Sequence, residues 1–108
     1  MQPNSNVVQS SIEAVEAEMR RIGAWQDQPL ADAQYDFHAA FASDTMAFEQ
    51  WLQFVFIPRV RSIIVDGGEF PSRSEVSAQA FREWVAWGNR QDVESLIERL
   101  REFDALFG

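Results

Sequence analysis

Few side chains of this protein could carry out catalysis. His38 is the only histidine and cysteine is absent, so neither a two-histidine metal site nor a thiol nucleophile can be assembled. A serine nucleophile would need His38 as its base, and no Gly-x-Ser-x-Gly turn is present to hold one. The pair Gly67-Gly68 lacks the strand, the later glycine and the lysine of a phosphate-binding loop, and indicates a helix end. We therefore predict no catalytic, metal-binding or cofactor-binding residues, and a protein that is not an enzyme.

Acidic residues are numerous, and one of them occupies an unusual position. Glu94, Glu98 and Glu102 recur at helical spacing among arginines, which is typical of a solvated helix face. Asp104 instead falls in the middle of the apolar stripe of the same predicted helix. Because a buried carboxylate without a partner is costly, we expect an arginine or a tryptophan N–H to bind it. Arg59 is the preferred donor of this structural ion pair, and a ligand site is the alternative.

Three arginines could form a binding surface. Arg59 and Arg61 stand two residues apart and diverge on a regular helix. If a bend at Pro58 turns both outward beside Arg73, they form a local positive spot on an acidic protein. Such a spot could contact an acidic partner or a phosphate, and ordinary exposed surface is the alternative.

Large aromatic side chains present the same choice between core and interface. Trp51 and Trp84 lie on strongly apolar faces, which indicates core positions. Trp25, between the first two helices, and Trp87, at a helix end, are the candidates for partial exposure. Phe56 falls on the polar side of its predicted helix, so it either packs under the 24–43 segment or belongs to an apolar surface patch. The candidate interaction residues are therefore Trp25, Phe56, Arg59, Arg61 and Trp87.

Composition and charge indicate one small acidic domain over residues 1–108. Of the 108 residues, 46% are hydrophobic and 13% are aromatic, which suits a single hydrophobic core. Nine arginines face 17 acidic residues, and the resulting net charge of −8 repels phosphate backbones, so we expect no direct binding of nucleic acid. Neither a signal peptide nor a membrane-spanning apolar run is visible. We therefore expect no membrane association and a cytoplasmic location.

The first half of the chain divides into a helix and a long connection. The first helix is predicted over 6–22, with Asn6 as its cap and Gly23 at its end, and residues 1–5 are expected to be disordered. The 24–43 segment has no clean period, but it carries too many large apolar groups for a flexible linker. This connection should therefore pack onto the other helices.

The second helix is predicted over 44–65, with Asp44 or Thr45 as its cap. Its first part is apolar almost all the way round, which predicts a central element with neighbours on several sides. Pro58 has no N–H to donate to the carbonyl four residues before it, so the helix should bend or split just before this residue. Two more helices are expected at 75–87 and from a cap at Asn89 to about 107.

These elements predict an all-α protein. We expect a four-helix bundle with a long packed connection between helices one and two and a proline-bent central helix.

A set of short motifs recurs in one known family. They are Asp44-Thr45-Met46, Trp51-Leu52-Gln53 and Ile57-Pro58-Arg59, preceded by Trp25 and Leu30 and followed by Asp104-Ala105-Leu106-Phe107. In their order and spacing the chain resembles the YqcC-like family of small bacterial proteins over nearly its whole length, with phenylalanine at position 54, where the family often has tryptophan. The resemblance implies an all-helical bundle from a Gram-negative bacterium, with no established activity. Family members are often encoded beside a tRNA pseudouridine synthase, which implies an accessory link to tRNA pseudouridine modification.

Together these observations favour a non-catalytic protein-interaction or accessory module. Its partner, an unknown protein or a tRNA pseudouridine synthase, would meet exposed aromatic groups near the bend and the connection, with Arg59 and Arg61 setting orientation. The sequence leaves open whether the protein forms a homo-oligomer. The alternative is a small apolar or anionic ligand bound in a pocket between helix two, the 24–43 connection and helix four. A third possibility is direct assistance to a tRNA-modifying enzyme, with affinity for RNA only when the enzyme is present.

Overall fold

The computed structural model describes residues 3–107, and the regular structure among them is entirely helical. The elements follow in the order α1 (Ser5–Arg21), the 3₁₀ turns η1 (Asp32–Tyr35) and η2 (Ala40–Ala42), α2 (Phe48–Trp51), the π-helical segment η3 (Leu52–Phe56), α3 (Ile57–Asp66), α4 (Val76–Ala80), the π-helical segment η4 (Phe81–Ala86) and α5 (Glu94–Asp104). Because α2, η3 and α3 are continuous, as are α4 and η4, the chain forms four main helices. The predicted all-α class is confirmed.

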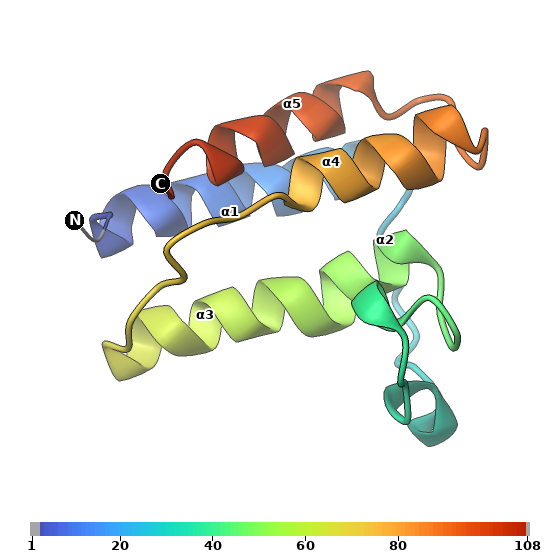
Figure 1. Cartoon of the computed structure of the whole chain (residues 1–108), viewed down its shortest axis with the longest axis horizontal. Helices are drawn as coiled ribbons and strands as arrows, with labels where there is room; N and C mark the ends of the chain where they lie inside the picture. Colours follow the sequence, from blue (N-terminus) through green and yellow to red (C-terminus); the bar gives the residue numbers. More distant parts are fainter. Residues whose placement is uncertain (1–2, 108) are drawn as a thin grey trace.

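The helices lie in two layers (Figure 1). α1 and α5 pack along each other and α4 packs against α5, while α3 runs below them and contacts α1. The long helix is central over its first part, where Leu52 and Ile57 have no exposed surface. Its last turns lie at the edge, and Val65 is 84% exposed. No helix in the 3–107 range is long and apolar enough to cross a membrane.

α1 follows its local sequence signals, with a shifted start. Asn4 is its cap in place of the predicted Asn6, because the Asn4 side-chain oxygen accepts the Asn6 N–H at 2.7 Å. Ser5 is already helical, so the helix begins before its predicted start. Residues 1 and 2 lie outside the described part, and the disorder expected for residues 1–5 stays a prediction. Gly23 follows the helix with a φ of 73°, the left-handed conformation that ends many helices at glycine. The apolar stripe is fully buried and consists of Val8, Ile12, Val15 and Met19.

The second helix begins later than predicted, because the connection uses its expected caps. The Asp44 carboxylate accepts the His38 N–H at 2.9 Å, and this backbone hydrogen bond lowers the pKa of Asp44. The Thr45 hydroxyl donates to a carbonyl of the connection at 2.6 Å. Gln50 caps the helix instead, since its Oε1 accepts the Ala47 N–H at 2.9 Å. The predicted caps are therefore wrong, although both residues still order the chain just before the helix.

The interruption expected before Pro58 takes the form of a π-helical segment. Proline cannot donate to the Phe54 carbonyl. The Ile57 N–H reaches back five residues to the Leu52 carbonyl, so the helix widens over η3 and resumes as α3 with Pro58 in its first turn. Ile57 keeps helical dihedrals of −60° and −47°, so the chain continues through the proline without a break.

The last helix also starts later than predicted, and Asn89 is not its cap. Val93 occupies the cap position of α5. Residues 87–93 are held as a loop by Arg90, whose Nη2 donates to the Ile22 carbonyl at 2.7 Å and whose Nη1 lies 3.5 Å from Glu49. Arg90 thus joins the loop to the end of α1 and to α2. These contacts hold residues 87–93 in a loop, so α5 cannot start earlier.

The connection packs onto the bundle as predicted, and a buried amide anchors it. Gln53 is only 7% exposed. Its Oε1 accepts the Gln26 N–H at 3.0 Å and its Nε2 donates to the Gln26 carbonyl at 2.7 Å. Gln50 adds a bond from its Nε2 to the Gln26 side chain at 3.0 Å. Gln53 thus satisfies the backbone of Gln26, and Gln50 binds the Gln26 side chain, where the connection crosses η3.

Candidate functional site

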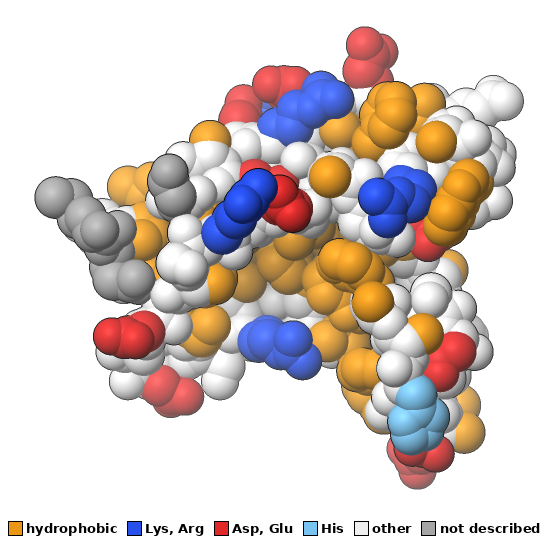
Figure 2. All heavy atoms as spheres, viewed as in Figure 1, with side chains coloured by type: hydrophobic (Ala, Val, Ile, Leu, Met, Phe, Trp, Pro, Cys, Tyr) orange, Lys and Arg blue, Asp and Glu red, His pale blue; other side chains and the backbone are white. Residues whose placement is uncertain are grey.

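An open groove lies between α3 and the 69–76 segment, with the end of α5 at its base. We call it the α3 groove. Figure 2 shows it as an apolar hollow near the centre of this face, with basic side chains at its edges. Its volume of about 530 Å³ falls within the range of ligand pockets, about 300–1,000 Å³. The apolar lining consists of Phe41, Trp51, Phe56, Val60, Ile63, Phe70, Pro71, Val76, Phe103 and Phe107, and the polar rim consists of Arg59, Glu69, Arg73, Ser74 and Glu75.

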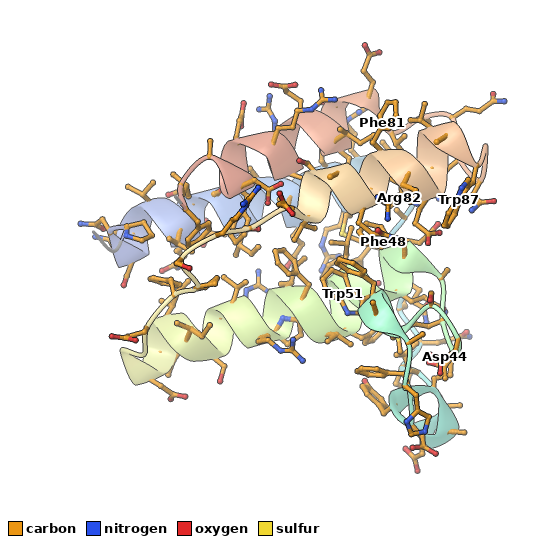
Figure 3. All side chains as sticks on the ribbon, viewed as in Figure 1. Asp44, Phe48, Trp51, Phe81, Arg82 and Trp87 are labelled. Atoms are coloured by element: carbon orange, nitrogen blue, oxygen red, sulfur yellow. The ribbon has the colours of Figure 1, made fainter. Side chains whose placement is uncertain are left out.

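Stacked aromatic rings form the inner wall of the groove. Trp51 stacks on Phe48 at 5.5 Å between ring centroids and on Phe56 at 5.4 Å. Phe103 meets Phe56 edge-on at 5.2 Å. Figure 3 shows Phe48 and Trp51 projecting into the space between the α2 end of the long helix and α4. This cluster ties η3 to α5 and closes the inner end of the groove.

The π-helical segment explains why Phe56 lies in this wall. In a regular α-helix, residues five apart are separated by about 140° around the axis. The hydrogen bond of η3 spans five residues, which brings Phe56 round to the side of Trp51. A 3.6-residue period therefore assigned Phe56 to the polar side, whereas the structure buries it at 9% exposure.

The connection contributes Phe41 to the groove from a strained turn. Phe41 and Ala42 have φ values of 56° and 53°, which residues with a Cβ atom rarely adopt. The Ala42 carbonyl accepts the N–H groups of Thr45 and Met46, both at 3.1 Å, and Ala42 itself is fully buried. The Phe41 ring lies edge-on to Trp51 at 4.9 Å. Packing and hydrogen bonds thus hold the strained pair in place at the end of the groove.

Two of the three candidate arginines reach the rim. Arg59 is exposed, and it has no hydrogen bond or ion pair with another side chain in the described part of the protein. Arg73, on the opposite side, pairs with Glu75 at 2.6 Å. Arg61 instead points to α1 and binds Glu16 at 2.7 Å. The expected spot of three arginines is therefore not formed, and Arg59 is the cation that the groove offers to another molecule.

Glu16 forms a contact between two helices that the sequence period did not predict. It accepts hydrogen bonds from Arg61 at 2.7 Å and from Arg20 at 3.0 Å. Burial opposes the ionisation of Glu16, but the hydrogen bonds from the two arginines outweigh it and lower the pKa of this carboxyl. The cluster joins α1 to α3 beside the groove. No spacing within α1 identifies a partner that lies 45 residues away.

Asp104 has hydrogen-bond partners, but neither the predicted arginine, Arg59, nor a tryptophan N–H is among them. Its carboxylate accepts the hydroxyl groups of Ser74 at 2.5 Å and of Ser77 at 2.6 Å. It also accepts the backbone N–H groups of Val76 at 3.2 Å and of Ser77 at 2.9 Å. These donors belong to the start of α4, so Asp104 caps α4 from the end of α5. The expected pair with Arg59 is wrong because backbone donors leave no mark in a sequence.

The two candidate tryptophans outside the groove differ in exposure. Trp25 is half-buried, with the Arg20 guanidinium 4.5 Å above its ring. Trp87 is 61% exposed. Figure 3 shows Phe81 and Trp87 on α4–η4 pointing away from the inner wall, and Phe81 is 46% exposed. Phe81 and Val85 border a second hollow of about 310 Å³ between η4 and α5. A role for these residues in an interface stays a prediction.

A further surface depression and His38 have fewer features of a binding or reactive site than the α3 groove. A surface depression of about 780 Å³ lies between the end of α1 and the start of α5, but its lining is mostly charged and includes Arg21 and Arg101, which are paired with neighbouring glutamates. His38 is exposed, with its Nε2 at 3.8 Å from Asp36. Within the described residues, no group of three or more histidine, aspartate or glutamate side chains is placed to hold a metal ion.

Comparison with known proteins places the chain in a family. The DUF446 family, described as "tRNA pseudouridine synthase C", matches residues 7–106. The chain belongs to the DUF446 family. This match and the relatives below confirm the resemblance to YqcC-like proteins.

Three relatives illustrate what members and neighbours of the DUF446 family are. An uncharacterized protein of Haemophilus influenzae is 32% identical over 72 residues, which cover 67% of this chain and 68% of the relative. The uncharacterized protein YqcC of Escherichia coli is 26% identical over 100 residues, covering 93% and 90%. A tRNA pseudouridine synthase C of Pectobacterium carotovorum is 34% identical over 59 residues, which cover 55% of this chain and 16% of the synthase. No solved structure matches the chain.

Proposed function

We propose that this DUF446 protein is a non-catalytic accessory module that binds a tRNA pseudouridine synthase of the C type in the cytoplasm. The observation that carries the proposal is the 59-residue match within a chain named tRNA pseudouridine synthase C. Since those residues are only 16% of the synthase, that chain has ample length for a catalytic part beside the matched stretch. A similar stretch occurs within a tRNA pseudouridine synthase C in one bacterium and over 90% of the length of YqcC in another, which supports a physical association of the family with the synthase.

The chemistry of the chain supports a binding role. The α3 groove has an apolar lining and an arginine at its rim, which are the features of a protein-binding or ligand-binding surface. The net charge of −8 suits a partner that binds RNA, because such proteins present basic surfaces and attract acidic ones. The same charge disfavours tRNA as a direct ligand of the isolated protein.

Titration calorimetry of the purified protein with the tRNA pseudouridine synthase C of the same bacterium tests the proposal. We expect saturable heat of binding and co-elution of the two proteins in size-exclusion chromatography. Pseudouridine formation in tRNA is then measured with and without the accessory protein. An unrelated protein of similar size and net charge controls for nonspecific attraction. Absence of a complex at micromolar concentrations, or tight binding of tRNA by the protein alone, would contradict the proposal.

A second candidate function is the binding of a small apolar carboxylate in the α3 groove. It is favoured by the apolar lining next to Arg59, whose guanidinium has no ion pair with a described side chain. Native mass spectrometry of the protein purified from its own cells would detect such a ligand as a bound mass. Dodecanoate is a suitable probe, and its binding should be lost in Arg59→Glu.

A further inference from the structure

We infer that the α3 groove receives a segment of the synthase that inserts large apolar side chains between α3 and the 69–76 segment and places a carboxylate against Arg59. The inference rests on the proposed function and deepens it by assigning the contact surface. It goes beyond the family match, which says nothing about how the two proteins meet.

The apolar wall of α3 faces the groove in a regular stripe. Phe56, Val60 and Ile63 are spaced by four and three residues and line one side. α3 also contacts α1, and Phe56 at the start of the stripe packs on Phe103 of α5. Phe70 and Phe107 stand on the opposite wall, with ring centroids 5.9 Å apart. Phe56 and Val60 are only 9% and 7% exposed, so the partly exposed Ile63 provides the accessible apolar surface of this stripe.

The width of the groove limits what can enter it. Val60, Phe70, Val76 and Phe107 are each only 6–7% exposed although they line the hollow. A whole helix would need a broad exposed face, whereas single large side chains fit between such walls. Large side chains that fill a desolvated pocket are the usual energetic centre of a protein interface. The geometry therefore points to a partner segment that projects one or two apolar anchors.

The charges at the rim of the groove predict which charge the partner segment carries. Arg73 is already paired with Glu75 at 2.6 Å, which leaves Arg59 as the arginine of this rim without an ion pair in the described residues. Because the protein has a net charge of −8, a carboxylate of the partner is disfavoured over most of the surface and favoured beside Arg59. Glu69 lies on the same rim, and it opposes such a carboxylate. Replacing Glu69 should therefore not weaken binding.

The charge contact is tested by matched variants in calorimetry with the synthase. Arg59→Glu should weaken binding at least about tenfold, since it replaces an attraction by a repulsion at a docked surface. Arg82→Glu makes the same change at an exposed arginine that does not line the groove, and should alter the dissociation constant less than about twofold. Glu69→Gln should leave binding unchanged or strengthen it. Equal losses for Arg59→Glu and Arg82→Glu would overturn the inference.

The apolar contact has its own matched pair on α3. Ile63→Ser removes part of the groove wall and should weaken binding about fivefold or more. Val65→Ser removes a similar side chain that is 84% exposed and outside the groove, and should have little effect. Circular dichroism and urea unfolding of each variant show whether it is folded. Arg59→Glu keeps the test valid if Ile63→Ser fails to fold, because Arg59 is exposed and has no ion pair with any residue from 3 to 107.

The outcomes separate the inference from the proposed function. If the wild-type protein binds the synthase and both Arg59→Glu and Ile63→Ser bind equally well, the groove is not the contact surface and the proposed function stands. If the wild-type protein does not bind, both are wrong. If the two groove variants lose dodecanoate binding but keep the synthase, the groove is a ligand pocket and the inference is overturned.

Discussion

Asp104 is the residue whose replacement tests the architecture most directly. Its carboxylate joins the end of α5 to the first turn of α4 through the hydroxyl and N–H groups of Ser77, the hydroxyl of Ser74 and the N–H of Val76. The first N–H groups of a helix have no acceptor within the helix itself. Asp104→Ala would leave the donors of Val76 and Ser77 without a protein acceptor, and would also remove a negative charge from the positive end of the helix.

The expected cost follows from the hydrogen bonds that the substitution removes. Loss of a helix cap costs about 0.5–2 kcal/mol, and hydrogen bonds to a charged group are worth about 1.5–3 kcal/mol each. Asp104 is half-buried, so water can replace part of this stabilisation. We therefore expect Asp104→Ala to lower the free energy of unfolding by about 2 kcal/mol. Asp104→Asn keeps one acceptor oxygen and should cost about half as much.

Urea unfolding followed by circular dichroism measures this difference. With a urea dependence of about 1–3 kcal/mol per molar, a loss of 2 kcal/mol lowers the midpoint by about 1 M. Glu102→Ala is the matched control, because Glu102 is an exposed carboxylate of the same helix whose contact is a surface pair with Arg99. Amide exchange should also accelerate at Val76 and Ser77. A change in stability below about 0.5 kcal/mol, or equal to that of Glu102→Ala, would refute the assigned role.

Four further substitutions test three other parts of the fold by urea unfolding. Gln53→Leu should lower the free energy of unfolding by about 2 kcal/mol despite its apolar side chain, because it leaves the N–H and carbonyl of Gln26 without partners; a neutral result would contradict the anchoring role. Glu16→Gln should destabilise the folded protein at pH 7. The pKa of Glu16 is lowered in the folded state, so its ionised form contributes stability above the pKa of the unfolded chain, and this contribution is lost in acid. The difference in stability between wild type and variant should therefore shrink below about pH 4.5, and a constant difference down to pH 2 would refute this. Gly67→Ala should lower the free energy of unfolding by about 1 kcal/mol, because the φ of Gly67 is 66°. Gly68→Ala should lower it less, because the added Cβ would meet Ile63 at an ordinary contact distance of 3.8 Å. Equal losses would be inconsistent with backbone strain at Gly67.

Local signals were sufficient where a single helix determines the outcome. The stripe of α1 from Val8 to Met19 is buried as its 3.6-residue spacing predicts. Gly23, Gly67 and Gly88 follow helices with left-handed backbone conformations, as residues that end helices should. These features depend on residues a few positions apart, so periodicity and turn chemistry are enough to identify them.

Helix starts were predicted poorly because distant partners compete for the capping residues. Asp44 is a good N-cap by type, but it binds the backbone of His38 in the connection. Asn89 is equally suitable, but the contacts of Arg90 with Ile22 and Glu49 hold its segment as a loop. A sequence shows which residues can cap, and only the tertiary structure decides which of them do.

The groove could be predicted only in part. The sequence predicts a pocket between the long helix, the connection and the last helix, and Trp51, Phe41 and Phe103 of these elements do line the groove, but its second wall is the 69–76 segment, which the prediction did not include. It placed Phe56 on the polar side because it assumed a regular period through the residues before Pro58. The proline did signal an interruption, but whether a helix kinks, breaks or widens depends on what packs against it.

In the proposed complex, the groove would have to be one part of a larger contact. Two apolar anchors fully buried there would contribute about 3–6 kcal/mol at 1.5–3 kcal/mol each. Association of two free proteins costs about 4–15 kcal/mol before any net affinity appears. Where a similar stretch lies in the same chain as a synthase, a covalent link raises the effective concentration to about the millimolar range and offsets much of this cost. A noncovalent complex of the kind proposed has no such link and needs additional buried surface, which the exposed side chains of Phe81 and Val85 on η4 and of Trp87 at its end could provide.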